Sequence, residues 1–224
     1  MKILPREKKA RLRLVGLLVL LLALSIWRWG YALLAGVVYQ PEVGDLLFQS
    51  LPNPPGQDIV DAIEGCTNSD FSHCGVVVKK GKDWYVLEGM VPTVQEIPLR
   101  KWLLRGKGRF AAYRLQKEKR AHIPAWIESM REQLGLVYDF RYRMSDEEIY
   151  CSELPYDGWL AVTGEEMGQV RKLGDLPWQP YREVILKVEG SDTVPVEREM
   201  ITPRDLAAAP QLELVVAHGV QRDR

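Results

Sequence analysis

The sequence predicts an α+β domain with an antiparallel sheet and a few helices, preceded by an N-terminal membrane segment. Three observations carry this prediction. Two β-branched and aromatic runs, 74–79 and 84–87, flank a Lys-Gly-Lys-Asp turn, which is typical of a β-hairpin. Residues 124–134 place apolar side chains at helical spacing between a Pro and a Gly. A basic segment followed by an apolar run opens the chain.

The N-terminal segment has the pattern of a signal peptide or a signal anchor. Residues 1–13 carry six Lys or Arg and one Glu, and an uncharged run follows over 14–27. Extended to about 20 residues, with Arg28 snorkelling at the far end, this run reaches across a bilayer. Since no convincing small-x-small cleavage site follows it, we predict an uncleaved transmembrane helix within 1–39 rather than a cleaved signal. The positive charges then stay inside and place residues 40–224 on the outer face.

Composition narrows the class of the remaining chain. The 224 residues carry 30 basic and 30 acidic side chains, so the part after residue 13 has a net charge of −5 and is a poor candidate for nucleic-acid binding. No repeat or long linker interrupts 40–224, which predicts one domain. Three cysteines cannot build a disulfide scaffold, and no metal, P-loop or dinucleotide motif is present. We therefore expect no cofactor and no metal.

The other elements follow from local patterns in chain order. Turn residues, Pro positions and short apolar runs define their limits. The expected elements are a strand at 44–49, a Pro-rich loop at 51–56, a short helix at 59–63, a short helix or loop at 98–104, a strand at 109–115, a helix from about Cys151 to 162, a strand at 183–188 and a helical turn at 202–207 with Thr202 as N-cap.

The hairpin brings a histidine and a carboxylate together. If its turn is centred between Gly81 and Lys82, Gly75 lies opposite Glu88. His73 and Glu88 then lie diagonally on one face of the sheet, with only Gly75 between them. This is the arrangement of a base with its orienting acid. A three-residue loop would instead turn Glu88 to the other face.

The third candidate is Cys151, in the sequence Tyr-Cys-Ser-Glu-Leu-Pro. Pro155 is tolerated only in the first turn of a helix, so the helix begins close to Cys151. A thiol at a helix N-terminus has a lowered pKa, and the backbone N–H groups there can stabilise an oxyanion. A small buried residue is the alternative reading of Cys151. Cys66 and Cys74 either form a disulfide or lie free, with Cys74 in the core. His122 and His218 lie in polar contexts typical of a surface.

Six segments together resemble the YiiX-like branch of the NlpC-type cysteine hydrolases. These segments occur in the order of that family and span about 165 residues. They are the opening strand GDLLFQ at 44–49, the histidine strand SHCGVVV at 72–78, the acid strand VLEG at 86–89, LGLVYDF at 134–140, YCSEL at 150–154 and ITPRDLA at 201–207.

The resemblance implies a circularly permuted papain-like domain in which the histidine precedes the cysteine. Carried over by position, it implies Cys151 as nucleophile, His73 as general base and acid, and Glu88 as the group that orients His73. Two segments depart from the family pattern, Pro155-Tyr156 and 141–143 (Arg-Tyr-Arg), and both affect the expected pocket. Asp45 and Asp139 are expected to fix turns through hydrogen bonds to the backbone.

The implied function is a membrane-anchored thiol hydrolase of amide bonds, with a peptide or acyl-amide substrate. Placement on the periplasmic side of a bacterial inner membrane, with a single membrane-spanning helix, makes peptidoglycan stem peptides the expected substrate. Two alternatives stay open. A lipid amidase, thioesterase or acyltransferase would have an apolar groove beside Cys151, and a non-catalytic wall-binding module would have a blocked cleft.

Overall fold

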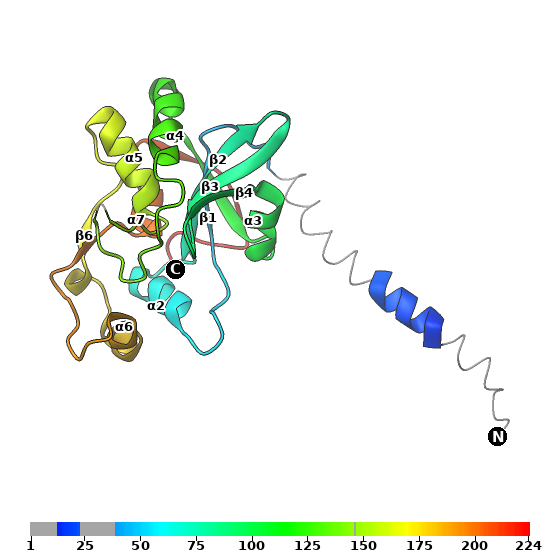
Figure 1. Ribbon diagram of the computed structural model, residues 1–224, viewed down its shortest axis with the longest axis horizontal. Coiled ribbons are helices and arrows are strands. Elements are labelled where there is room, and N and C mark those ends of the chain that lie inside the picture. The colour runs from blue at the N-terminus through cyan, green and yellow to red at the C-terminus, as the bar shows by residue number, and fades with distance from the viewer. Residues whose placement is uncertain (1–12, 23–38, 146) are drawn as a thin grey trace.

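The computed structural model describes residues 13–22, 39–145 and 147–224 (Figure 1). Residues 13–22 form a helix. No helix within the described ranges is both long and apolar enough to cross a membrane. The anchor expected over 1–39 falls mostly on residues 1–12 and 23–38, which lie outside the described ranges, and it stays a prediction.

A six-stranded antiparallel sheet forms the centre of the domain, in the order β4-β3-β2-β1-β5-β8. The hairpin between β2 and β3 pairs Lys80 with Asp83 and Val76 with Leu87, so the predicted two-residue turn is confirmed. Gly81, with φ of +59°, supplies the left-handed conformation that this turn needs. The strands are β1 (Leu46–Gln49), β2 (His73–Lys80), β3 (Asp83–Gly89), β4 (Val94–Pro98), β5 (Phe110–Leu115) and β8 (Leu212–His218).

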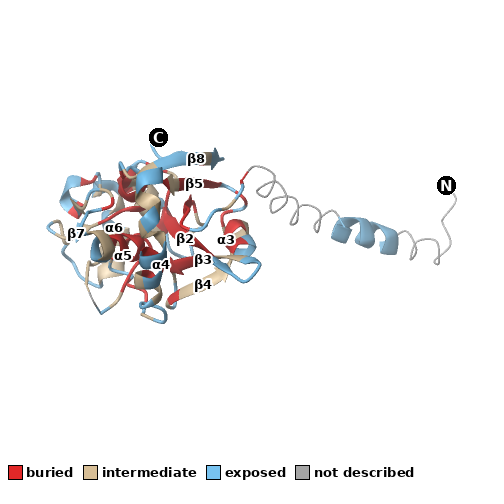
Figure 2. Ribbon diagram, turned by 90° about the horizontal axis from the view of Figure 1, so that it is seen from above, coloured by how far each residue is buried: buried red, intermediate tan, exposed pale blue. Residues whose placement is uncertain are grey.

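Helices cover the sheet on both faces (Figures 1 and 2). On one face, side chains such as Phe48 and Val76 join a large core with Trp126 and Trp159. The helices of this layer are α4 (Ile123–Arg131), α5 (Glu153–Thr163) and α7 (Pro203–Ala207), and the 3-10 helix η1 (Lys117–His122) leads into α4. On the other face, α3 (Leu99–Arg105) buries Trp102 in a smaller core. Sheet residues therefore alternate between two apolar layers.

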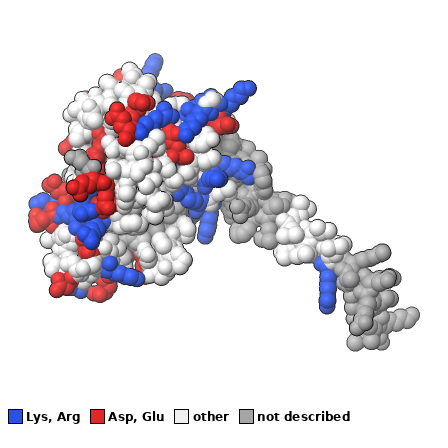
Figure 3. All heavy atoms as spheres, in the orientation of Figure 1, with Lys and Arg blue, Asp and Glu red and all other residues white. Residues whose placement is uncertain are grey.

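A third apolar cluster lies beside the sheet, around Cys66, Leu173 and Leu176. It is enclosed by α2 (Ile59–Thr67) and α6 (Arg182–Glu189), and by a small sheet of β6 (Arg171–Lys172) and β7 (Glu199–Met200). Two short 3-10 helices, η2 (Leu173–Asp175) and η3 (Gln179–Tyr181), connect these elements. Charged side chains of both signs are interspersed on the face shown in Figure 3, with a broad uncharged area between them.

The predicted strand at 183–188 is wrong, because these residues form α6. A short apolar run fits a strand or a helix equally well from its pattern. Here Ile185, one helical turn after Tyr181, packs with it onto the third cluster, and Gly190 ends the helix in a left-handed conformation. The sequence pattern also missed β4 and β8, the two outer strands of the sheet. By contrast, the Thr202 cap is confirmed, since its side chain accepts a hydrogen bond from the Asp205 N–H.

Candidate active site

His73 and Glu88 are in contact, as the hairpin register predicts. His73 begins β2, Glu88 lies on β3, and Nε2 of the histidine is 2.7 Å from Oε2 of the carboxylate. Both side chains are buried. Gly75 permits the contact, because a Cβ there would lie 3.2 Å from the Cβ of Glu88 and 2.5 Å from a methyl group of Val86. Since Nε2 faces Glu88, Nδ1 is the ring nitrogen left for another partner.

Glu88 is held by two further residues that the sequence did not single out. Gln95 donates to Oε1 at 3.1 Å, and Arg105 donates to Oε2, the same oxygen that faces His73. Burial alone would raise the pKa of Glu88, but hydrogen bonding and charge from His73 and Arg105 hold it below its ordinary value. The pairing of Glu88 with Gln95 across β3 and β4 is the signal for Gln95, and β4 itself was not predicted.

Cys151 lies just before α5, where Ser152 is the N-cap residue. The turn that carries it is fixed by Glu153, whose buried carboxyl accepts from the backbone N–H groups of Ser145 at 2.9 Å and Tyr150 at 3.2 Å. Burial, followed by the charge of Asp157, raises the pKa of Glu153 to about 9. Glu153 therefore shapes the turn at the thiol.

Cys151 is supported from two sides, by the segment around Ile201 and by the end of β3. Ser152 Oγ donates to the Ile201 carbonyl at 2.8 Å, and the Ile201 N–H donates to the Tyr150 hydroxyl at 2.9 Å. On the opposite side, Gly89 lets the end of β3 approach closely, since a Cβ there would lie 3.1 Å from the Tyr150 carbonyl group. The thiol is thus held between the sheet and the closing segment 201–207.

The thiol of Cys151 is electrostatically distinct from the other two thiols. Its pKa is lowered well below the ordinary value, chiefly by hydrogen bonding with the Cys74 side chain and also by hydrogen bonding and charge from His73, against the effect of burial. Cys74 itself donates to the Cys151 carbonyl at 3.2 Å. Burial raises the pKa of Cys66 to about 11. All three cysteines are free, so a disulfide between Cys66 and Cys74 is absent from the described residues.

The imidazole of His73 has the complementary shift. Burial would lower its pKa, but hydrogen bonds to Cys151 and Glu88, together with the charges of both groups, raise it to about 9. Thiolate and imidazolium therefore stabilise each other at neutral pH. The indole of Trp102 lies tilted beside the ring, with 6.1 Å between centroids, and closes the α3 side of the site.

Two tyrosines also lie at the Cys151 thiol. Burial raises the pKa of the Tyr138 hydroxyl well above the usual value, and the charges of Tyr142 and Cys151 and hydrogen bonding with both side chains raise it further. Tyr138 and Tyr142 pack edge to face at 6.5 Å. Tyr138 lies in the family segment 134–140, but no sequence pattern marked it as a site residue. A tyrosine with this pKa stays a hydrogen-bond donor at neutral pH.

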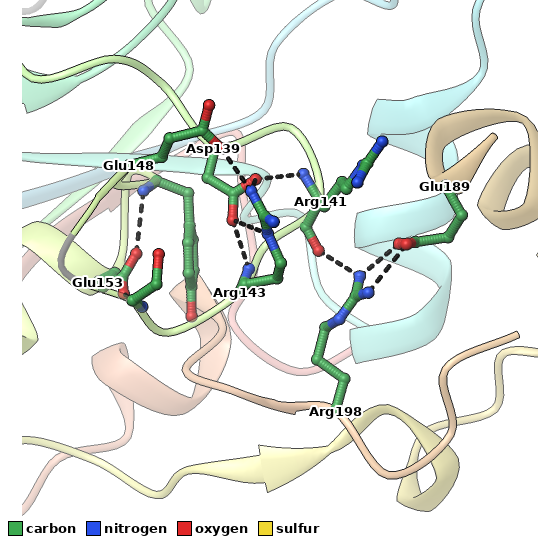
Figure 4. A network of polar contacts seen from close by, with 9 residues as sticks. Asp139, Arg141, Arg143, Glu148, Glu153, Glu189 and Arg198 are labelled. Carbon is green, nitrogen blue, oxygen red and sulfur yellow. Dashed lines mark hydrogen bonds and ion pairs between the residues drawn. The ribbon is translucent and has the colours of Figure 1, made fainter. Parts of the chain in front are cut away.

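Asp139 fixes the loop after Tyr138 (Figure 4). Its carboxylate accepts from the backbone N–H groups of Arg141 at 2.8 Å and Arg143 at 2.7 Å. Asp45 acts in the same way at the start of β1, where it accepts from the Glu42 N–H at 2.8 Å. The expectation that both aspartates fix turns is confirmed.

An apolar pocket that is partly open to solvent adjoins Cys151. Of the two departures from the family pattern, Arg141 and Tyr142 line this pocket, whereas Pro155 and Tyr156 are buried residues of α5 outside it. The apolar lining comes from α2, α6 and the segments around β6 and β7. Its members include Ile59, Ala62, Ile63, Cys66, Leu173, Leu176, Ile185, Val188, Met200 and Ile201.

Comparison with known proteins gives consistent results. The sequence profile of the permuted papain-like amidase enzymes of the YaeF/YiiX, C92 family matches residues 40–216. The uncharacterized protein YiiX of Escherichia coli K12 is 30% identical over 186 residues, which cover 79% of this chain and 87% of YiiX. A crystal structure titled metalloprotein YiiX, from Escherichia coli O157:H7, superposes with a TM-score of 0.69 at 28% identity, covering 80% of this chain and 99% of that one.

Proposed function

The chain belongs to the C92 family of permuted papain-like cysteine amidases, and on this premise we propose that it hydrolyses amide bonds through Cys151, His73 and Glu88. The observation that carries the proposal is the position of the His73 ring. One nitrogen lies 2.7 Å from a buried carboxylate, and the ring hydrogen-bonds to a thiol of lowered pKa. A nucleophile, a base and an orienting acid in contact form the minimal set for acyl transfer.

In the first half of the proposed reaction, the Cys151 thiolate attacks the carbonyl carbon of the substrate. The carbonyl oxygen becomes an oxyanion, for which backbone N–H groups at the start of α5 and the Tyr138 hydroxyl are the available donors. The His73 imidazolium then gives its proton to the amide nitrogen. The C–N bond breaks, the amine leaves, and the acyl group remains on Cys151 as a thioester.

Water completes the reaction in the second half. Neutral His73 takes a proton from a water molecule as the water oxygen attacks the thioester carbon. The C–S bond breaks, the carboxylic acid leaves, and the thiolate–imidazolium pair is restored. Throughout both halves, Glu88 keeps Nε2 of His73 occupied, which leaves Nδ1 to exchange the proton with the thiol.

The solved relative is titled a metalloprotein, which raises the question of a metal in this chain. The described residues gather no group of three or more His, Cys, Asp or Glu side chains suited to a metal ion. Because the residues present do not fit a metal site, the proposed mechanism contains no step through a metal.

The pocket favours an acyl-amide substrate over a peptidoglycan stem peptide. Stem peptides carry several charged groups, and most of the residues that line the pocket are apolar and offer these groups no hydrogen-bond partners. An acyl chain gains about 0.8 kcal/mol for each buried CH₂ group. We therefore place the acyl side of the substrate in the pocket beside Cys151, with stem peptides as the second candidate. The presence of Cys151 in the wall of a pocket favours catalysis over a non-catalytic binding module, for which a blocked cleft was expected.

We retain the periplasmic face of a bacterial inner membrane as the proposed location. It is supported by the basic and apolar pattern of residues 1–38. An acyl-amide substrate would be available at such a surface.

Thiol labelling of the full-length chain with iodoacetamide, from pH 5 to 9 and mapped by mass spectrometry, tests the proposal. Cys151 is expected to react rapidly well below pH 8, and His73→Ala should slow this reaction. Cys66 provides a control within the same molecule, because its raised pKa predicts slow labelling throughout. Equal rates at Cys151 and Cys66, unaffected by His73→Ala, would exclude the mechanism.

Hydrolysis of N-octanoyl amides and of stem tripeptides is then compared in the wild type and in Cys151→Ala. Loss of turnover in Cys151→Ala, with a preference for octanoyl amides in the wild type, is the expected result. A preference for stem peptides would restore the cell wall as the substrate source.

A further inference from the structure

Arg141 supplies the uncompensated charge in the pocket beside Cys151. The charged residues that line this pocket are Arg141, Glu189 and Arg198. Arg198 binds both carboxylate oxygens of Glu189, with Nη2 to Oε2 at 2.8 Å, so this pair neutralises itself. Within the described residues, the guanidinium of Arg141 has no carboxylate in ion-pair contact. One positive charge therefore remains at an otherwise apolar site.

Hydrogen bonds hold the backbone of Arg141, whereas its guanidinium pairs with no carboxylate of the described residues. Its N–H donates to Asp139 at 2.8 Å, and its carbonyl accepts from Arg198. Figure 4 shows the side chain leaving the loop away from Asp139 and toward α2, which forms one wall of the pocket. Nearby Arg143 differs, because its guanidinium binds both Asp139 and Glu148. Arg143 therefore stabilises the loop, whereas the side chain of Arg141 is available to the pocket.

The same loop connects Arg141 to the reactive thiol. Tyr142 adopts a left-handed conformation, with φ of +55°, which is strained for a residue with a side chain. Its ring packs edge to face on Tyr150, 5.5 Å between centroids, and Tyr150 directly precedes Cys151. Because Arg141 and Cys151 line one pocket, a small substrate can contact both.

We propose that Arg141 is a specificity residue that binds an anionic group of the substrate, which makes the substrate class an anionic acyl amide. This inference rests on the proposed function, in which the acyl chain lies in the pocket with its carbonyl at Cys151. A carboxylate or a phosphate on the amine portion has the required charge, as in an N-acyl amino acid or an N-acyl aminoalkyl phosphate. A guanidinium binds either anion through charge-assisted hydrogen bonds.

The test compares three probes of equal acyl length on the full-length chain: N-octanoylglycine, N-octanoyl-2-aminoethyl phosphate and the neutral N-octanoylglycinamide. Because Arg141 is exposed, we expect an advantage in kcat/KM of about tenfold for an anionic probe over the neutral one. Arg141→Gln should slow the anionic probes about tenfold more than the neutral one and so remove this advantage. Arg141→Lys should keep part of it, and added salt should reduce it.

Arg182→Gln is the matched control, since Arg182 is an exposed arginine of α6 that pairs with Glu183 and does not line the pocket. This variant should keep the full preference for anionic probes. Whichever of the carboxylate and phosphate probes has the larger advantage identifies the source of the anion. An equal loss with anionic and neutral probes in Arg141→Gln would show a structural role and overturn the inference.

Binding to Cys151→Ala separates this inference from the proposed hydrolysis. Calorimetry of the same probes needs no turnover, so an anionic preference that disappears in the Cys151→Ala, Arg141→Gln double variant supports the anion subsite even if the wild type cleaves none of them. In that case the hydrolysis proposal alone fails. Equal affinity for anionic and neutral probes, or no binding of any probe, would overturn the inference.

Discussion

The two sides of the Cys151 thiol are built from opposite kinds of side chain. On the sheet side, hydrogen bonds join His73, Glu88, Gln95 and Arg105 into one buried to half-buried network in which the charges are paired. On the other side, α2, α6 and the segment around β7 enclose an apolar pocket. In the proposed function, the first side sets the protonation states of the reaction and the second side selects the substrate. The two sides should therefore respond differently to mutation.

Glu88→Gln is expected to have the largest effect, because it removes the charge that supports the His73 imidazolium. Both contributions of Glu88 to the raised pKa of His73 are lost while burial still lowers it, so this pKa falls from about 9 toward or below its ordinary value. As the pH rises, the imidazolium that protonates the leaving amine is then deprotonated at a lower pH than in the wild type. We expect kcat/KM at neutral pH to fall about 10²- to 10⁴-fold and its alkaline limb to move down.

Glu96→Gln is the matched control for this change. Glu96 lies on β4 with its side chain almost fully buried, and it pairs with Lys80 and Arg131 rather than with His73. Its loss should lower the melting temperature without moving the pH profile of kcat/KM. If Glu88→Gln and Glu96→Gln had the same effect on activity, Glu88 would be a structural residue of the sheet.

Ala62→Phe changes the apolar side of the comparison. Ala62 lies on α2 in the pocket wall and is 4% exposed, so a phenyl ring there occupies space proposed for the acyl chain. Wild-type kcat/KM should rise about fourfold for each CH₂ group that the pocket buries. In Ala62→Phe, we expect N-octanoyl amides to lose about tenfold or more relative to N-acetyl amides, with the pH profile unchanged.

The control for this pocket variant is Ala161→Phe, at an exposed position of α5 outside the pocket. It should leave the ratio of octanoyl to acetyl rates as in the wild type. If Ala62→Phe slowed both substrates equally, the pocket would not hold the acyl chain, and the peptide alternative would gain support.

How much the sequence predicts also differs between the two sides. The contact of His73 with Glu88 follows from one local feature, the two-residue turn at Gly81 and Lys82, because a turn fixes the register of its own hairpin. The position of Cys151 beside that pair depends on packing between segments about 80 residues apart. Only the order of the family motifs indicated it before the structure was known.

The pocket could not be predicted because its walls come from separate parts of the chain. The residues of α2 and α6 that meet at the pocket are more than a hundred positions apart in the sequence. The apolar run in α6 was also interpreted as a strand. Arg105 was missed for a related reason. Its partner Glu88 lies on β3, and the two side chains come together only because α3 packs against one face of the sheet.

Arg105→Gln is expected to have the smallest effect, a shift of the pH profile rather than a loss of activity. Arg105 and His73 share one oxygen of Glu88, so the guanidinium takes part of the carboxylate's charge from the imidazole. Without it, Glu88 supports the imidazolium alone, and the pKa of His73 should rise above about 9. We expect the alkaline limb of kcat/KM to move up by about half to one pH unit.

Two variants of the same helix distinguish this positioning role from a structural one. Arg105→Lys keeps the charge and should return the alkaline limb toward its wild-type position, whereas Lys101→Gln, at an exposed position of α3, should not move it. A purely structural Arg105 would lower kcat/KM equally at every pH and leave both limbs in place. A downward shift of the alkaline limb would mean that Glu88 has become protonated without Arg105, because a neutral Glu88 no longer supports the imidazolium. The direction of the shift therefore tells whether Arg105 competes with His73 for the carboxylate or keeps that carboxylate charged.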